Sequence, residues 1–297
     1  MIIREQEIID ERYRIIKELG EGGFAYVYQA EDIITGKEVA LKIIKENALK
    51  SKDNLIRFER EARASASLNH PNIVKVVNIG YHHDLPYMAS ELVKGKTLRG
   101  QLDEQKRYSF HQACHIMVEL CEAVQFAHNA LVIHRDIKPD NVFLTPDETV
   151  KLGDFGIAFF ENSRRVTKSQ VIIGSVHYLP PEVTNGQSPT FKSDIYSLGI
   201  TFFELITGRV PFEGNNQINV AMMHIKERFP SPRQFVTTTP KSLEKIILKA
   251  CRKNPLDRYR SVLDMQRDIQ SCLDDPQKLQ PRKSFWSRFL GLKTHDE

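Results

Sequence analysis

The sequence predicts an α+β fold of two lobes, in which a small antiparallel β-sheet lobe with one helix precedes a larger, mainly α-helical lobe. Three observations carry this prediction. The chain has 297 residues, a length at which a single hydrophobic core stops growing and chains divide into two units. Short β-rich runs separated by glycine fill its first third. From Thr97 onward the apolar residues recur with helical spacing instead.

The β-rich runs of the first lobe contain many β-branched and aromatic residues and are bounded by turn residues, as strands are. Between the third and fourth runs, Asp53 to Leu68 lacks glycine and proline and places Phe58, Ala62 and Ser65 at helical spacing, which predicts one helix. The expected strands are Tyr13–Leu19, Ala25–Ala30, Glu38–Ile44, Ile73–Ile79 and Pro86–Leu92.

The second lobe is expected to consist of amphipathic helices. Ser109 is a candidate N-cap, and it precedes a stripe of apolar residues spaced as on one helix face. Further helices are expected at Ser193–Thr207, Ser242–Cys251 and Ser261–Leu273. The lobes meet near Lys94-Gly95-Lys96, so we divide the chain into an extension (1–12), a domain (13–274, with lobes 13–93 and 94–274) and a tail (275–297).

Composition and charge exclude several classes of protein. Most of the formal net charge of +4 comes from the tail, so the nearly neutral body argues against a broad nucleic-acid-binding surface but leaves a local basic strip open. No apolar run approaches the roughly 18 residues that cross a bilayer, and the charged N-terminus does not resemble a secretion signal. The four cysteines have neither disulfide-motif nor zinc spacing. We therefore expect a cytoplasmic protein with reduced thiols.

A glycine-rich segment connects the first two expected strands: Gly20-Glu21-Gly22-Gly23-Phe24-Ala25-Tyr26-Val27. Glycines let a hairpin turn tightly and bring backbone N–H groups against phosphate oxygens. The same pattern is more often only a turn. It is not a dinucleotide-binding fingerprint, because a strand follows it, and it lacks the Lys-Ser/Thr end of a P-loop.

A lysine lies among apolar residues in the third expected strand, Val39-Ala40-Leu41-Lys42. Such a lysine is usually an exposed residue on the polar face of a sheet. Glu61 on the expected helix is a candidate partner, whose carboxylate would hold the ammonium so that it could bind α- and β-phosphates.

The third motif places a carboxylate, a cation and an amide in one turn-rich loop: His134-Arg135-Asp136-Ile137-Lys138-Pro139-Asp140-Asn141. Asp154-Phe155-Gly156 follows after a short expected strand. With these motifs in this order, the chain resembles the eukaryotic-type (Hanks-type) Ser/Thr protein kinases, in the style of bacterial members, over nearly all of Tyr13 to Asp274.

The resemblance implies a role for each residue of these motifs. Asp136 would accept the proton of the substrate hydroxyl, and Lys138 would contact the γ-phosphate, as in kinases that act on Ser and Thr. Asn141 and Asp154 would hold Mg²⁺, with Mn²⁺ as an alternative, and the metal would bridge the phosphates of ATP. Lys42 with Glu61 would complete the phosphate site.

The resemblance also implies an adenine pocket. Val27 and Ala40 would cover the ring from above, Phe143 would lie below it, and the backbone from Glu91 to Val93 would provide hydrogen bonds. Ser90 occupies the gatekeeper position. Two residues depart from the common pattern, since Ala25 stands where a third glycine is frequent and Phe143 is bulkier than the usual aliphatic residue.

Beyond the nucleotide, Ser175 to Glu182 resembles the end of a kinase activation segment, with Pro180 as a mild departure. Glu182 is expected to pair with Arg258, Asp194 to anchor the catalytic loop, and Ser175 to face the incoming hydroxyl residue. This segment separates protein kinases from small-molecule kinases of similar fold. A second alternative is a pseudokinase that binds nucleotide or partners without catalysis.

Regulation is expected in the same segment. Thr167 and Ser169 lie where many relatives are phosphorylated, so we expect autophosphorylation at one of them, for which two chains could associate, and Arg135 could bind the added phosphate. Phe159 stands where many relatives supply a second basic group, so the phosphate pocket lacks that cation. The alternative is that both hydroxyls are merely solvated loop residues.

The tail combines cations with Phe285, Trp286, Phe289 and Leu290, which would share one side of a short helix after Ser284. This pattern suits peripheral contact with anionic lipid or an acidic partner. A tail packed on the larger lobe or a disordered tail are alternatives of equal weight. The expected partners are thus proteins with Ser or Thr residues, a second copy of the chain and a membrane surface, but not nucleic acid.

Overall fold

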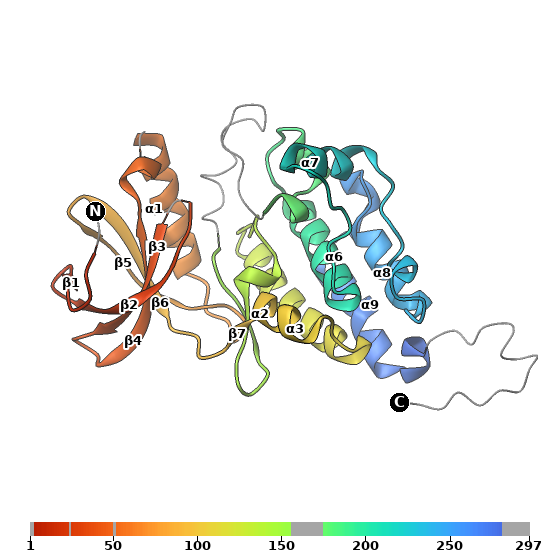
Figure 1. The fold of residues 1–297 in the computed structure, drawn as a ribbon, viewed down its shortest axis with the longest axis horizontal. Coiled ribbons are helices and arrows are strands. Elements are labelled where there is room, and N and C mark those ends of the chain that lie inside the picture. Colours follow the sequence, from red (N-terminus) through yellow and green to blue (C-terminus); the bar gives the residue numbers. More distant parts are fainter. Residues whose placement is uncertain (1–2, 24, 50–51, 156–174, 281–297) are drawn as a thin grey trace, which may run out of the picture.

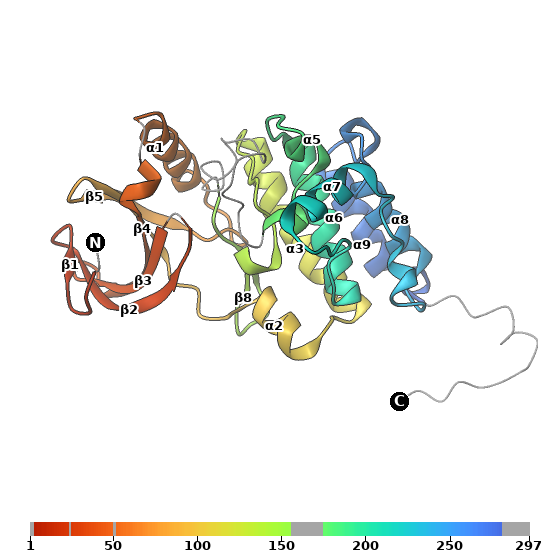
Figure 2. The same ribbon diagram turned by 45° about the horizontal axis from the view of Figure 1, so that its top comes forward.

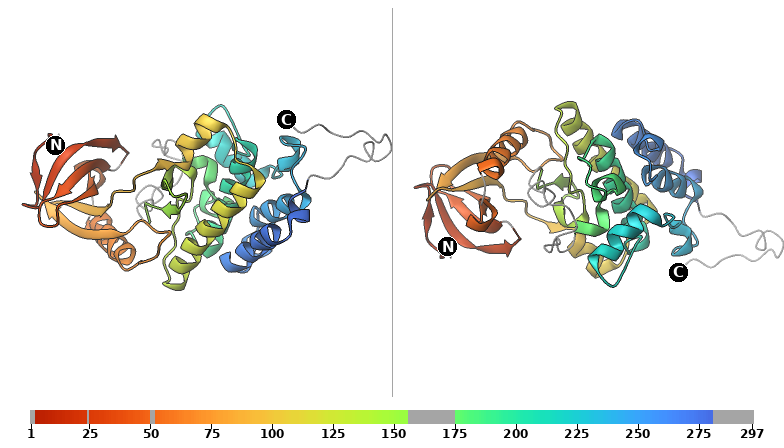
Figure 3. Two further views of the ribbon diagram at one scale, coloured as in Figure 1. Left: turned by 90° about the horizontal axis from the view of Figure 1, so that it is seen from below. Right: turned by 90° about the horizontal axis from the view of Figure 1, so that it is seen from above.

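The computed structural model describes residues 3–23, 25–49, 52–155 and 175–280. They form two lobes side by side, a β-sheet lobe with one long helix and a helical lobe (Figure 1). Figure 3 shows the same two lobes from below and from above, with strands of the helical lobe at the junction. The predicted α+β arrangement is confirmed.

The small lobe contains a six-stranded antiparallel sheet in the order β1-β2-β3-β4-β6-β5. The five strands that we predicted are present, with ends that differ by a few residues. A further strand, β1, precedes them. The strands are β1 (Ile8–Ile9), β2 (Tyr13–Glu21), β3 (Ala25–Asp32), β4 (Lys37–Ile44), β5 (Val76–His82) and β6 (Leu85–Glu91).

The two faces of this sheet pack against different partners. On one face, α1 (Lys52–Ala66) buries Phe58 and Ala62 against Ile44, Val76 and Met88. The other face forms its own core with the segment before β2, which buries Ile3 and Ile9. The stretch that we set apart as an extension therefore adds both a strand and core residues to the small lobe.

The expected strand at Ile73–Ile79 begins later than predicted. Ile73 forms a parallel bridge with Leu152, and the Val74 amide donates to the Leu152 carbonyl oxygen at 2.9 Å. The regular register with β6 begins at Val76. The apolar residues at the start of this run, Ile73 and Val74, therefore belong to the contact between the lobes. Periodicity alone cannot distinguish such a contact from a strand.

The large lobe is built around α6, which is buried over nearly its whole length. The predicted N-cap Ser109 accepts a backbone hydrogen bond at the start of α3, and Ser261 does the same at the start of α9. The helices are α2 (Leu98–Gln105), α3 (Phe110–Asn129), α5 (Pro181–Thr184), α6 (Phe191–Thr207), α7 (Gln217–Lys226), α8 (Lys241–Ala250) and α9 (Val262–Asp274).

A three-stranded sheet of β7 (Lys96–Thr97), β8 (Val142–Leu144) and β9 (Val150–Leu152) lies where the lobes meet. Figure 2 shows β8 beside α2 on the side of the helical lobe that faces the sheet lobe. This small sheet holds the two loops that carry Asp136 and Asp154.

The four cysteines are free, as predicted, and all four are buried. In the described ranges, no helix is both long and apolar enough to cross a bilayer.

Candidate active site

The catalytic loop is anchored by a carboxylate of α6. Asp194 accepts the backbone N–H groups of His134 and Arg135, each at 2.9 Å, and its Oδ2 lies 2.7 Å from Nε2 of His128. Arg135 has a left-handed φ of 74°, a conformation that costs a non-glycine residue energy and persists only when its surroundings hold it. The expected role of Asp194 is thereby confirmed.

Asp136 is held by two side-chain donors from its own loop. Lys138 Nζ and Asn141 Nδ2 approach its Oδ2 at 2.6 and 2.9 Å, and Asn141 Nδ2 also donates to the Asp136 carbonyl oxygen at 2.8 Å. The structure thus brings together three of the residues that the sequence singled out. Because both donors converge on one oxygen, Oδ1 remains the oxygen that can accept a substrate proton.

The buried ring of His134 connects the two loops. The Asp136 amide donates to Nδ1 at 3.2 Å, so Nε2 carries the proton and donates to the Gly153 carbonyl oxygen at 2.8 Å. Burial lowers the pKa of His134 below its ordinary value, so the ring is neutral. This link fixes the backbone of Asp136 relative to that of the residue before Asp154.

Lys42 crosses from the small lobe to Asp154, with Nζ 2.8 Å from Oδ1. The surroundings of Asp154 tend to raise the pKa of its carboxyl by desolvation. The Lys42 ammonium outweighs this effect and holds the pKa below its ordinary value. Glu61 lies within α1, but its side chain is outside the described part of the structure, so the expected pair with Lys42 stays a prediction.

Phe155 connects this site to α1. Its buried ring lies 4.5 Å from that of His134, and its carbonyl oxygen accepts a hydrogen bond from Ser65 of α1 at 3.3 Å. The position of α1 is therefore linked to the residue that follows Asp154.

The strand register shows which face of the sheet carries Val27 and Ala40, which we expect above the adenine ring, and the gatekeeper Ser90. Val27 pairs with Lys42, and Ala40 pairs with Ser90, and residues directly opposite in an antiparallel sheet point to the same face. Lys42 and Ala40 are two residues apart and share that face. Val27, Ala40 and Ser90 therefore lie on the face from which Lys42 reaches Asp154.

On the other side of the junction, Phe143 of β8 packs against Gly153. A Cβ at Gly153 would lie 3.3 Å from Cε2 of Phe143, so the glycine lets the ring lie close to the backbone that leads to Asp154. The bulky Phe143 is thus accommodated.

Glu91 braces the connection between the lobes, a role that sequence reasoning missed. Its Oε1 accepts the Lys75 amide at 3.0 Å and Nζ of Lys151 in β9 at 2.6 Å. Its own amide donates to the Lys75 carbonyl oxygen at 2.9 Å. Because these contacts join residues far apart in the sequence, no local pattern could have indicated them.

The glycine-rich segment forms the hairpin between β2 and β3, as predicted. Its turn is closed by the Gly22 amide, which donates to the Ala25 carbonyl oxygen at 2.9 Å. Phe24 lies outside the described residues. Lys45 also contacts this hairpin, which we did not predict from the sequence. Its Nζ lies 2.5 Å from Oε1 of Glu21 and 2.7 Å from the Gly22 carbonyl oxygen.

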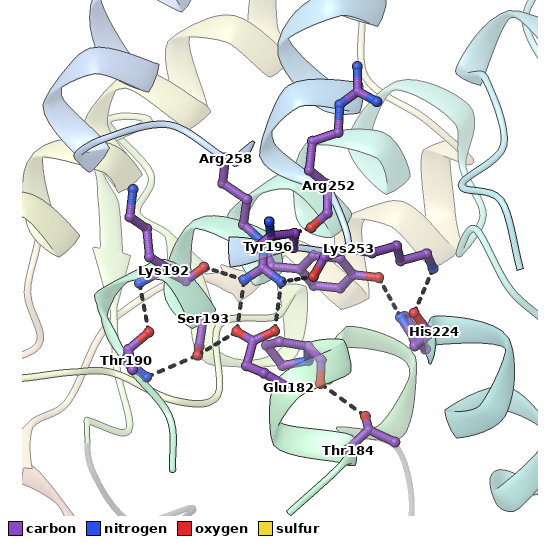
Figure 4. A network of polar contacts seen from close by, with 12 residues as sticks. Glu182, Thr184, Thr190, Lys192, Ser193, Tyr196, His224, Arg252, Lys253 and Arg258 are labelled. Carbon is purple, nitrogen blue, oxygen red and sulfur yellow. Dashed lines mark hydrogen bonds and ion pairs between the residues drawn. The ribbon is translucent and has the colours of Figure 1, made fainter. Parts of the chain in front are cut away.

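The expected pair of Glu182 with Arg258 is present and buried. The guanidinium donates NH1 and NH2 to the two carboxylate oxygens at 2.8 and 2.6 Å, and Ser193 Oγ donates to Oε1 at 2.8 Å (Figure 4). Arg258 also lies over the ring of Tyr196, whose hydroxyl contacts Nδ1 of His224 at 2.9 Å. The network therefore joins α5, α6 and α7.

Several predicted residues cannot be compared with the structure. Thr167 and Ser169, with Phe159 and Gly156, lie outside the described residues, as does the tail from residue 281. The side chain of Ser175 is also outside the description. The backbone of Arg135 is described, but its expected contact with a phosphate on the segment stays a prediction.

The fold and the residues at the lobe junction define a protein kinase. A family model for the protein kinase domain matches residues 13–272, and the chain belongs to this family. It is 41% identical over 266 residues to the serine/threonine-protein kinase PrkC of Bacillus subtilis, covering 90% of this chain and 41% of that protein. The expected resemblance to bacterial Hanks-type Ser/Thr kinases is confirmed.

Another curated relative and a solved structure support the assignment to the protein kinase family and its fold. The chain is 36% identical over 266 residues to the serine/threonine-protein kinase PknB of Mycobacterium leprae, covering 88% of this chain and 43% of that protein. It thus spans about two fifths of the length of these curated relatives. The Mycobacterium tuberculosis PknI kinase domain has the same fold, with a TM-score of 0.74 at 23% identity, over 91% of this chain and 99% of that one.

Proposed function

We propose that this chain transfers the γ-phosphoryl group of ATP to Ser and Thr hydroxyls of proteins, with Mg²⁺ as the metal and Mn²⁺ as an alternative. One observation carries the proposal: Lys138 and Asn141 converge on one oxygen of Asp136. This arrangement orients the other oxygen as a base and keeps a cation beside it, which suits the attack of a hydroxyl on a phosphate.

The residues present fit a magnesium nucleotide. Asn141 uses its Nδ2 on Asp136, and no described residue donates to its Oδ1, so a hard oxygen ligand is left for a metal. The Asp154 carboxylate supplies a second. Within the described ranges, no cluster of three or more His, Cys, Asp or Glu residues could hold a metal without help. Mg²⁺ commonly takes only one or two protein ligands and completes its shell with phosphates and water.

In the proposed reaction, the substrate oxygen forms a bond to the γ-phosphorus while the bond to the β-phosphate oxygen breaks and ADP leaves. Asp136 takes the proton of the attacking hydroxyl. Lys138 and Lys42 offset negative charge on the phosphates. Asn141 and Asp154 would hold the metal, which neutralises charge that would repel the nucleophile.

The adenine ring is proposed to lie between the face that carries Val27, Ala40 and Ser90 and the ring of Phe143. The backbone of Glu91 and Val93 would bind its edge. Two observations support this placement: the strand register puts the first three on one face, and no described residue accepts the Val93 N–H.

The decisive experiment incubates the purified chain with labelled ATP, Mg²⁺ and a generic protein substrate. We expect label on Ser and Thr, and we expect Asp136→Asn to lower the transfer by about 100-fold or more while nucleotide binding persists. Binding without transfer in the unmodified chain would instead indicate a pseudokinase. Label confined to small molecules would indicate a small-molecule kinase.

We also propose that two chains phosphorylate each other at Thr167 or Ser169. Arg135 supports this proposal because Asp194 fixes its backbone next to Asp136, the proposed base. A phosphate bound by Arg135 could therefore affect the position of the base. Phosphosite mapping after ATP treatment, compared with Asp136→Asn, tests it. An unmodified segment in the active protein would contradict it.

We propose that the chain is cytoplasmic and that its tail contacts anionic membranes peripherally. Residues 276–279 pack on the large lobe, where Ser242 donates to the Lys278 carbonyl oxygen. The test therefore removes only residues 281–297 and measures flotation with anionic liposomes, with neutral liposomes as the control. Equal flotation of both chains would exclude the lipid contact.

A further inference from the structure

Lys45, the residue after β4, holds the glycine-rich hairpin from outside. Its Nζ lies 2.5 Å from Oε1 of Glu21 and 2.7 Å from the Gly22 carbonyl oxygen, and 4.4 Å from the centre of the Tyr26 ring. The Lys45 side chain is 14% exposed, whereas that of Glu21 is 55% exposed. Three contacts thus converge on one ammonium beneath an otherwise open turn.

The strand register shows on which face this ammonium lies. Val27 pairs with Lys42, whose side chain reaches Asp154, so Val27 faces the site. Neighbouring residues in a strand point to opposite faces, and Tyr26 packs with the core on the far side of the sheet. Glu21 pairs with Tyr26 and shares its face. Lys45 therefore contacts the hairpin from the face that points away from the site.

The orientation of one peptide follows from this contact. In a planar trans peptide the C=O and the next N–H point in opposite directions. Since the Gly22 carbonyl points to Lys45 on the outer face, the Gly23 N–H points to the face of Val27 and Lys42. The Gly22 N–H is already used by the Ala25 carbonyl oxygen.

We propose that Lys45 is a positioning residue that turns the Gly22–Gly23 peptide so that the Gly23 N–H faces the nucleotide phosphates. This inference rests on the proposed function, since it concerns the same ATP site. An outside contact is needed because two consecutive glycines, which lack Cβ atoms, let the peptide rotate at little cost. Lys45 supplies it without entering the site.

The test compares adenosine, ADP and ATP as ligands of the wild type and of Lys45→Met, which keeps an apolar stem on Tyr26 but loses the ammonium. We expect a three- to tenfold weaker affinity for ATP and ADP, about the value of one hydrogen bond. Adenosine affinity is expected to change less than twofold. KM for ATP should rise by the same factor as the ATP affinity falls, and Lys45→Arg should recover most of the loss.

Arg14→Met is the matched control. It removes an ion pair between β2 and β3, the two strands of the hairpin, at the end away from the glycine-rich turn, where Arg14 NH1 lies 2.8 Å from Oε2 of Glu31. It should change neither the nucleotide affinity nor the adenosine affinity. If Lys45→Met fails to fold, Glu21→Ala removes the exposed carboxylate and should give a smaller loss that is again confined to ADP and ATP.

Two results would overturn the inference: unchanged ATP affinity in Lys45→Met, or an equal loss for adenosine. The failure of the proposed function looks different. In that case the wild type itself would neither bind ATP with Mg²⁺ nor transfer phosphate.

Discussion

Lys42 of β4 and Asp154, 112 residues further along the chain, form an ion pair between the two lobes, with Nζ and Oδ1 2.8 Å apart. The side chains are 16% and 44% exposed. Partly exposed pairs of this kind contribute at most about 1 kcal/mol to stability. The pair therefore brings two site residues together across the lobe junction but contributes little to the stability of the fold.

Function and stability should consequently separate in Lys42→Met. We expect phosphoryl transfer to fall by about 100-fold or more, because one preorganised cation is lost, and the melting temperature to change by less than about 3 °C. Transfer of labelled phosphate and a thermal melt measure the two effects. Activity within fivefold of wild type would show that Lys42 is not part of the phosphate site.

The pair of Glu182 and Arg258 should behave in the opposite way, because its side chains are 6% and 0% exposed. Arg258→Met leaves a buried carboxylate without its partner and is expected to cost about 3–5 kcal/mol of unfolding free energy. Adding Glu182→Gln should recover part of this loss. Urea denaturation of the two single variants and the double variant provides the coupling energy.

Lys96→Met is the control for this cycle. It removes an exposed pair, Lys96 Nζ to Glu104 Oε1 at 2.6 Å, and should cost less than about 1 kcal/mol. Equal losses for Lys96→Met and Arg258→Met would mean that burial does not determine the strength of these pairs.

The segment before β2 yields a test with adjacent residues. Ile9 is fully buried against the outer face of the sheet, whereas Ile8 is 43% exposed. Ile9→Ala is expected to cost about 2–4 kcal/mol through lost burial and a cavity, and Ile8→Ala less than about 1 kcal/mol. Denaturant unfolding measures both. If Ile9→Ala is as mild as Ile8→Ala, residues 3–12 contribute little to the stability of the small lobe.

The sequence allowed the lobes and the catalytic loop to be predicted because their signals are local. Ser109 caps the start of α3, because its hydroxyl oxygen accepts a hydrogen bond from the Gln112 backbone N–H. The loop from His134 to Asn141 likewise folds on itself, with Lys138 and Asn141 reaching back to Asp136. Residues a few positions apart can be placed together by a short motif.

The contacts that escaped prediction are tertiary. Glu91 pairs with Lys151, which is 60 residues further along the chain. Lys45 pairs with Glu21, which precedes it by 24 residues. Each of these residues alone looks like an ordinary surface charge. Ile73 shows the converse error, since its apolar neighbours resemble a strand although it pairs with Leu152 between the lobes.

His224 leads to a prediction about pH. Its ring is fully buried, with Nδ1 against the Tyr196 hydroxyl, and Lys253 Nζ lies 2.6 Å from its carbonyl oxygen. The Phe212 ring also packs on it. Burial, with the charge of Lys253, lowers the pKa of His224 to about 3. The folded protein therefore keeps this ring neutral at pH values where the unfolded chain protonates it.

The sign follows from linkage. The pKa of this histidine in the unfolded chain is about 6.5. Below this pH the unfolded state binds a proton that the folded state does not bind, so the free energy of unfolding decreases as the pH falls from 6.5 toward 3. At pH 5 this group alone costs about 2 kcal/mol relative to pH 8. His224→Gln should remove that part of the slope, although it lowers stability at pH 8 by disturbing a buried contact.

Urea unfolding of both proteins between pH 5 and 8 measures this difference. His134, whose pKa burial also lowers, adds the same slope to both proteins and cancels in the comparison. Because His224 of α7 contacts the hydroxyl of Tyr196, whose ring lies under Arg258, its protonation would charge the network that holds α5, α6 and α7 together (Figure 4). Parallel stability curves for the two proteins would show that the ring accepts a proton in the folded state and that this network tolerates the charge.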